Sequence, residues 1–386
     1  MPRLARLMLF GTLTLSVIVG AADEVRSAEL QSRVVVGKQD TNASVRRCAN
    51  ALISKAGMIK SLAPKGLEIS TYEEADEENS NSRKAKQKAR PYVYVGEQTY
   101  GQDLVNQPFV FRDAEHVLAF LQSGAVYEEI RDNPTITRLT QPRLAIAYGG
   151  FYQMFSKSVA VTEPRHFYHR FIGGAVRASR VYGEFNALIN PYSGLNLNYD
   201  SVIESYAAKK MAENDSWTHM VEAHLASAIE NGFEGKGDYV NLISSTALMI
   251  NIGINNWDDV RFSPEELLAL RAWASAAAIE CSEANYQKEL DTLDRLKADG
   301  YEIVPFNRRA LVELSWRLSL EEQHGHWTIA QFDKIVSLGE FPKNGLLPSA
   351  MLNRMTPQKR NEALKHDSHA IYRMKEWKEN NEKYFR

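Results

Sequence analysis

Histidine pairs are the residues of this chain that could most directly hold a metal ion. His324 and His326 flank a glycine and follow two glutamates, and His166 and His169 form a second pair. A zinc site needs three or four ligands at characteristic spacing, and neither pair has a third ligand placed in that way. We therefore favour histidines that are solvated or hydrogen-bonded at helix ends, and we expect no metal.

Motifs for covalent or phosphate chemistry are not found in the sequence. Cys48 and Cys281 lie in helical patterns rather than at exposed turns, and no serine stands in a nucleophile elbow. The glycine pairs at 149–150 and 173–174 fit turns better than a phosphate-binding loop. We expect a protein that is not an enzyme and needs no cofactor, with a hydrolase as the least favoured alternative.

Composition and charge describe a globular protein without a nucleic-acid surface. The chain has 386 residues, of which 44% are hydrophobic and 24% charged, and its formal net charge is −2. These values are typical of one large or two medium domains. A near-neutral chain lacks the basic excess that phosphate neutralisation requires. The one dense basic run, 83–90, directly follows an acidic run, so 73–90 is predicted as a solvated loop and exposed helix.

The N-terminus has the pattern of a secretory signal peptide. Arg3 and Arg6 precede an apolar stretch at 7–20, and small residues follow up to Ala28. The apolar stretch of about 14 residues is shorter than the 18 to 20 that span a bilayer. We expect cleavage within 1–28 and a mature protein outside the cytoplasm, with an uncleaved anchor as the alternative.

The two cysteines could pair in an exported protein. A bond between Cys48 and Cys281 would tie an early helix to a long later one. Unpaired, both residues would be small buried apolar side chains. The sequence leaves these alternatives open.

The longest helical pattern of the chain runs over residues 263–300. Ser263 can cap it, Pro264 suits its first turn, Glu266 completes a capping box, and Gly300 supplies a left-handed end. At about 1.5 Å per residue this helix would be roughly 55 Å long, more than the width of a small domain. We therefore expect it to brace two lobes.

Strands and helices alternate along the rest of the chain, which predicts an α/β fold. The order strand, helix, strand over 33–72 implies a parallel crossover unit. Strands are predicted at 33–37, 67–72, 91–96, 144–148, 175–178 and 301–305. Helices are predicted at 44–62, from 113, at 181–188, 199–212, 307–324 and 328–338, and from 357.

Four segments stand out in order along the chain: PFVFRDAEHVLAFL at 108–121, AYGGFYQMFSKSV at 147–159, GGAVRASRVYGEFNALI at 173–189 and AENDSWTH at 212–219. Together they resemble segments of the extracytoplasmic solute receptors of tripartite ATP-independent periplasmic (TRAP) transporters. The stretch from 242 into the long helix is similar to the same family. The resemblance covers roughly residues 34–338.

This resemblance implies a two-lobed periplasmic solute-binding-protein fold over 29–340, with a polar helical tail at 341–386. The lobes would be interleaved in sequence and would cross near 148–152 and 239–252. A small carboxylate captured between them would be delivered to the membrane permease subunits of a TRAP system. The protein is expected to be periplasmic and monomeric. A ligand-binding partner of a membrane sensor is the alternative function.

The family's ligand-binding arginine matches Arg177 of this chain, and the asparagine of its second motif matches Asn214. A planar guanidinium can hold a carboxylate with two hydrogen bonds, and an amide can donate beside it. The alternatives are an ion pair of Arg177 with Glu184 or Glu213 and a capping role for Asn214. The complete set of expected ligand-binding residues is Arg177, Asn214, Tyr152, Glu213, Ser179 and Trp217.

Tyr152 departs from the family pattern, in which a second arginine commonly follows Gly-Phe. A tyrosine stacks or donates one hydrogen bond but brings no charge. This substitution weakens the case for a dicarboxylate. It allows a monocarboxylate, or a ligand with a ring or hydroxyl group facing Tyr152.

Overall fold

The computed structural model describes residues 31–36, 42–62, 68–72, 92–97, 104–126, 143–167, 172–175, 201–202, 208–209, 211–212, 220–255, 264–321, 328–339, 350–365 and 379. The predicted signal peptide, the charged run at 73–90 and the Ser263 cap lie outside these residues. No helix within the described ranges is long and apolar enough to cross a membrane.

The described strands form one sheet in the order β2-β1-β3-β9-β4-β7-β5-β6. In addition, β8 pairs with β4, and β10 pairs with β8. Their bounds are β1 Gln31–Val36, β2 Glu68–Tyr72, β3 Tyr92–Glu97, β4 Arg143–Ser156, β5 Ile172–Ala175, β6 Ser201–Val202, β7 Met220–His224, β8 Tyr239–Leu242, β9 Ala247–Asn255 and β10 Glu302–Pro305. Strand β1 runs parallel to both β2 and β3, which confirms the predicted crossover unit.

Two parts of this sheet share only β4. The first half-sheet contains β1, β2, β3 and β9, and β4 joins it through residues 143–151. The second half-sheet contains β5, β6, β7, β8 and β10, and β4 joins it through residues 152–156. Within the described residues the chain therefore passes between the two halves at one narrow place, through β4 itself and through the segment 243–246 that leads from β8 to β9 beside it.

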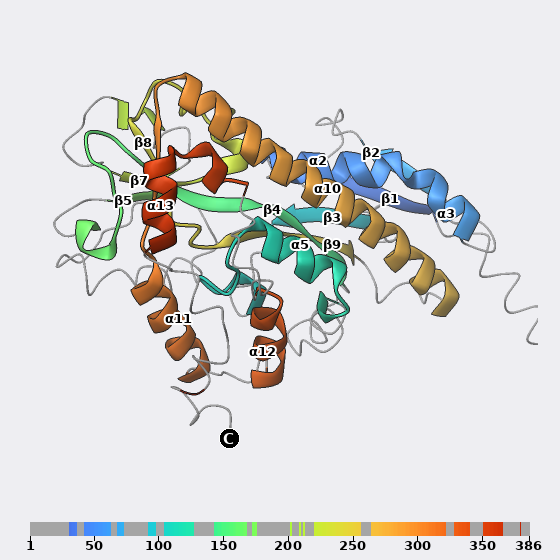
Figure 1. The fold of residues 1–386 in the computed structure, drawn as a ribbon. Coiled ribbons are helices and arrows are strands. Elements are labelled where there is room, and N and C mark those ends of the chain that lie inside the picture. Colours follow the sequence, from blue (N-terminus) through green and yellow to red (C-terminus); the bar gives the residue numbers. More distant parts are fainter. Residues whose placement is uncertain are drawn as a thin grey trace, which may run out of the picture.

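Helices cover both faces of the sheet. Figure 1 shows α2, α3 and α10 on one side, and α5, α11 and α12 on the other. Apolar residues of α2 and α10 pack on β9 to form one core, and those of α5, α11 and α12 form another. The bounds are α2 Ala43–Ser54, α3 Ala56–Leu62, α5 Ala114–Gln122, α10 Pro264–Ala298, α11 Arg309–Glu321, α12 Ile329–Ser337 and α13 Pro357–Lys365.

The predicted helix ends are largely confirmed. Asp113 caps α5 by accepting a hydrogen bond from the His116 amide, and Thr328 forms a capping box at α12. Gly300 follows α10 with a φ of +98°, in the left-handed region expected of a helix stop. These local signals were readable because each needs only a few adjacent residues.

Strand β4 is longer than predicted. Its first part was expected to end at Gly149 and Gly150, but the strand continues through them to Ser156. The glycines form an irregularity in the pairing with β9, between Tyr148 and Gly150, and Gly150 has a φ of +124°. A glycine pair can mark a bulge inside a strand as well as a turn. Here it redirects β4 from one half-sheet to the other.

Other differences concern short or polar strands. Strand β7 was not predicted, because its buried Glu222 and His224 interrupt the apolar pattern of a core strand. Residues 201–202 form β6, although the segment 199–212 was expected to be helical. The C-terminal segment 350–365 is also more than a polar tail, since Met351 and Met355 are buried against the second half-sheet.

The long helix α10 has 35 residues and lies along the edge of β4 that β9 leaves open. The Tyr148 amide donates to Ser282 Oγ at 2.8 Å, and the Tyr148 carbonyl accepts from Asn285 Nδ2 at 2.8 Å. The Phe151 amide donates to Glu289 Oε1 at 2.7 Å. Three side chains on one face of α10 thus satisfy backbone groups that have no strand partner there.

Glu289 is fully buried at this contact, and its Oε2 accepts from the Tyr148 hydroxyl at 2.5 Å. Burial raises the pKa of Glu289 to about 8, although the hydrogen bonds from Tyr148 and Phe151 oppose the shift. The charged groups around it are Arg47 on α2 and Glu115 on α5. Near neutral pH this carboxyl group therefore holds a proton in the folded chain.

Cys48 and Cys281 form a disulfide, and their Cα atoms are 4.8 Å apart. The sequence left open whether the two cysteines are paired, and the structure shows that they are. The bond joins α2 to α10 inside the first core, where both cysteines are fully buried. It therefore fixes the middle of α10 against the first half-sheet.

We predict that replacing both Cys48 and Cys281 by alanine lowers the free energy of unfolding by about 2–4 kcal/mol, because the bond closes a loop of over two hundred residues. Urea denaturation of the two proteins measures the difference. As a control, a thiol titration of the denatured, unreduced wild-type chain should find no free thiol. Two titratable thiols would contradict the pairing.

We predict that the free energy of unfolding falls as pH rises between about 4.5 and 8, because the unfolded Glu289 carboxyl ionises in this range while the folded one keeps its proton. The slope should approach about 1.4 kcal/mol per pH unit between about pH 5.5 and 7 and should fall to about half of this at pH 8, where the folded carboxyl ionises. Denaturation curves of the wild type and Glu289→Gln test this, since the variant should be flatter. Parallel pH profiles would show that Glu289 is not the responsible group.

Candidate functional site

The carboxyl ends of the parallel strands of both half-sheets face the place where β4 crosses. In the first half-sheet, β1, β2 and β3 run in one direction, and β3 ends at Glu97 opposite Ile250 of β9. In the second, β5, β6 and β7 are parallel, and β7 ends at His224 opposite Tyr152 of β4. Ligands of open α/β sheets bind beside the carboxyl ends of strands, so this is the candidate site.

A chain of hydrogen bonds joins the two sets of strand ends. Asn42, which caps α2, donates to Glu97 Oε1 at 2.7 Å. Its Oδ1 accepts from Ser227 Oγ at 3.2 Å, and the same Oγ lies 3.0 Å from His224 Nδ1. We call Asn42, Glu97, Tyr152, His224 and Ser227 the strand-end junction. It draws on α2 and β3 from one half and on β4, β7 and η5 (Leu225–Ser227) from the other.

Arg47 makes a second polar link between the halves. Its Nε donates to Asn285 of α10 at 2.5 Å, and one terminal nitrogen donates to Ser44 and to the Ala226 carbonyl. Burial lowers the pKa of Arg47, an effect that the nearby Glu230 opposes. The guanidinium is thus used to hold α2 against η5 and α10, rather than being offered to a ligand.

Tyr152 is the one expected ligand-binding residue within the described ranges, and it lies in the strand-end junction. Its side chain is only 4% exposed, and its ring lies 5.5 Å from the His224 ring, centre to centre. His224 in turn lies over Gly150, where a Cβ atom would come within 2.4 Å of Nε2. The missing side chain at Gly150 therefore makes room for this imidazole.

The other expected ligand-binding residues lie outside the described ranges: Arg177, Ser179, Glu213, Asn214 and Trp217. Strand β5 ends at Ala175, two positions before Arg177 in the sequence. Their roles stay predictions. Within the described ranges, no group of three or more His, Cys, Asp and Glu residues could hold a metal ion. The histidines at 324 and 326 fall outside those ranges.

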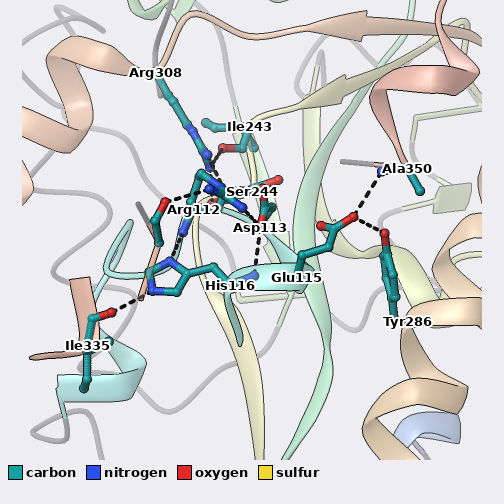
Figure 2. A network of polar contacts seen from close by, with 11 residues as sticks. Arg112, Asp113, Glu115, His116, Ile243, Ser244, Tyr286, Arg308, Ile335 and Ala350 are labelled. Atoms are coloured by element: carbon teal, nitrogen blue, oxygen red, sulfur yellow. Dashed lines mark hydrogen bonds and ion pairs between the residues drawn. The ribbon is translucent and has the colours of Figure 1, made fainter. Parts of the chain in front are cut away.

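A separate polar network lies at the start of α5 (Figure 2). Arg112 pairs with Asp113 at 2.6 Å, and Arg308 donates to the Arg112 carbonyl. His116 accepts from the Arg112 amide through Nδ1 and donates to the Ile335 carbonyl through Nε2. Burial lowers the pKa of His116 to about 4, so the imidazole is neutral. These bonds go mainly to backbone groups and dock α5 against α12, which is a structural role.

Figure 2 also shows how the C-terminal segment is attached. Glu115 of α5 accepts hydrogen bonds from the Tyr286 hydroxyl and from the Ala350 amide, the latter at 3.1 Å. Burial raises the pKa of Glu115, and the negative charge of Asp113 adds to the shift. Segment 350–365 thereby holds α5 beside α10.

Most of the strand-end junction was not foreseen from the sequence. Asn42, Glu97, His224 and Ser227 are far apart along the chain and follow no common spacing. Only the sheet order brings them together. A partial signal existed for Asn42 and Glu97, since one caps a predicted helix and the other ends a predicted strand.

Comparison with known proteins gives structural matches only. No family model matches the sequence, and no curated protein does so either. A TRAP periplasmic solute-binding protein from Escherichia fergusonii, in an open form without ligand, matches with a TM-score of 0.60 at 14% identity, over 80% of this chain and 100% of that one.

Two further solved structures are TRAP periplasmic solute-binding proteins with acids bound. The protein from Roseobacter denitrificans holds 3-deoxy-D-manno-oct-2-ulosonic acid and matches with a TM-score of 0.57 at 15% identity, over 80% of this chain and 99% of that one. The protein from Citrobacter koseri holds D-glucuronate, with 12% identity and the same TM-score and coverage. The chain described here therefore has the two-lobed α/β fold of TRAP periplasmic solute-binding proteins, with a long helix along both halves.

Proposed function

We propose that this protein is an extracytoplasmic receptor that captures a small organic acid between its two half-sheets. The observation that carries this proposal is the meeting of both sets of strand ends at the β4 crossing, within the fold of TRAP periplasmic solute-binding proteins. Proteins with this fold hold D-glucuronate, D-erythronate and β-D-galacturonate, all of which are small carboxylates.

Arg177 is our proposed anchor for the ligand carboxylate. It follows β5 by two positions, on the side of the strand ends, and a guanidinium can bind a carboxylate with two charge-assisted hydrogen bonds. Asn214 would donate beside it, and Ser179, Glu213 and Trp217 would line the same space. Tyr152 adds a neutral ring, which favours a ligand with a single carboxylate.

Capture would proceed by movement of the half-sheets about the β4 crossing. Because β4 and the adjacent segment 243–246 carry the described chain from one half to the other, small changes at residues 148–152 and 243–246 can alter the angle between the halves. The Asn42–Ser227 hydrogen bond and the Arg47 contacts bridge the halves on the side of α10. A ligand that contacts both halves would bind the closed arrangement more tightly than the open one. This difference in affinity would set how far binding shifts the population toward the closed arrangement.

Transport is the role we propose for this capture. The receptor would be periplasmic, would lose residues 1–28 on export, and would present its closed, loaded form to the membrane permease subunits of a TRAP system. We propose lobes interleaved over 29–340, with the tail at 341–386 attached through segment 350–365. The protein would act as a monomer and would not be an enzyme.

We predict that one of a panel of organic acids raises the unfolding temperature of the purified mature chain and that Arg177→Ala abolishes the response. An acid at a hundred times its dissociation constant stabilises the folded state by about 2.7 kcal/mol, which is several degrees for a chain of this size. A thermal-shift screen measures both effects.

The control for this screen is Arg165→Ala, which removes an exposed arginine that pairs with the neighbouring Glu163. This variant should respond like the wild type. If no acid shifts the wild type, or if Arg177→Ala responds as strongly, the proposal and its anchor residue are wrong.

A further inference from the structure

Thr246 has a buried hydroxyl group with no hydrogen-bond partner. Its side chain is 3% exposed, and its Oγ1 atom is among the buried polar atoms of the described residues that remain unpaired. Burying a hydroxyl without a partner costs free energy, so such atoms are rare in native proteins. One explanation is that a bound molecule supplies the missing partner.

The position of Thr246 supports that explanation. Its carbonyl accepts from the Tyr152 amide at 3.1 Å, so the residue lies beside the strand-end junction. It stands two positions before Leu248, and alternate residues of an extended chain face the same way. The hydroxyl therefore falls on the side of the sheet where Leu248 packs on Tyr152.

Tyr152 and Leu248 are themselves unusual among the buried apolar residues. They contact one another but belong to none of the three large cores of the described chain, which are the core of α2 and α10, the core of α5, α11 and α12, and the core around Met351 and Met355 on the second half-sheet. Both are nonetheless more than nine-tenths buried. A small apolar pair of this kind, with an unpaired hydroxyl next to it, has the composition of a ligand subsite, in which apolar walls surround a few polar groups.

Three basic residues of the described chain that contact neighbours of Tyr152 and Thr246 are already engaged, and the first of them, His224, bonds Ser227. Arg308 donates to the carbonyls of Ile243 and Ser244, which shortly precede Thr246 in the sequence, and to the carbonyl of Arg112. Arg47 is held by α10 and η5. A second ligand carboxylate at this place would lose its hydration without gaining a charged partner from the arginines of the described ranges, which is costly.

We propose that Tyr152, Thr246 and Leu248 form a neutral subsite for the uncharged end of the ligand, with the Thr246 hydroxyl bonding a ligand hydroxyl group. This inference rests on the proposed function, because Arg177 is taken to hold the carboxylate at the other end. It narrows the substrate class to monocarboxylic acids that carry a hydroxyl group on an aliphatic or ring skeleton.

The test uses Thr246→Val, which keeps the shape of the side chain and removes only the hydroxyl. The matched control is Thr292→Val, because Thr292 also has a buried and unpaired Oγ1 but belongs to the long helix α10 rather than to the strand ends. Titration calorimetry with D-gluconate, D-glucuronate and D-galacturonate should show about tenfold weaker binding for Thr246→Val and no change for Thr292→Val. Equal binding by both variants would overturn the subsite.

The charge preference is tested with D-gluconate and D-glucarate, which differ only in whether the far end is an alcohol or a second carboxylate. D-gluconate should bind at least tenfold more tightly. Equal or tighter binding of D-glucarate would show that this end of the site accepts a charge.

A ligand-independent measurement separates the subsite from the proposed function. If the wild type binds none of these acids, the proposal that the protein captures acids of this kind is wrong. A crystal structure of the mature chain still decides the subsite. A water or ligand atom within hydrogen-bond distance of Thr246 Oγ1 supports it. A Thr246 hydroxyl enclosed by protein atoms overturns it.

Discussion

The arrangement of this molecule depends on the open edge of β4 where that strand leaves one half-sheet and enters the other. Backbone groups at Tyr148 and Phe151 have no neighbouring strand on this edge and would be costly to bury unpaired. Ser282, Asn285 and Glu289 of α10 satisfy them. The long helix is therefore required at this place, and its position sets the geometry of both halves.

This constraint also explains why polar residues are buried at the centre of the fold. A carboxyl group at Glu289 is retained in an apolar environment because its two oxygens hydrogen-bond the Phe151 amide and the Tyr148 hydroxyl at once. Networks of this kind favour one arrangement over its competitors, since displacing any member leaves the others unpaired. The Cys48–Cys281 disulfide acts on the same helix from the first half-sheet. The second half of α10 is held instead by apolar contacts around Leu293 and Leu296.

The sequence predicted the α/β class, the parallel crossover, the long helix and several caps, because these depend on periodicity or on a few adjacent residues. It did not predict the length of β4, since a glycine pair is compatible with either a turn or a bulge. It also missed β7, whose polar residues are buried for reasons of tertiary structure. Of the candidate site, Tyr152 was foreseen from a family resemblance. Asn42, Glu97, His224, Ser227 and Thr246 were not, because sheet order alone brings them together.

We propose that the two half-sheets change their relative position when an acid binds. Paired spin labels at Asn50 on α2 and Gln358 on α13 would report this directly, since both residues are exposed and lie on opposite halves. Pulsed dipolar spectroscopy would give the distance distribution with and without the acid that stabilises the chain. We predict a shift to a different, narrower distribution on binding. An unchanged distribution at saturating acid would contradict the capture mechanism.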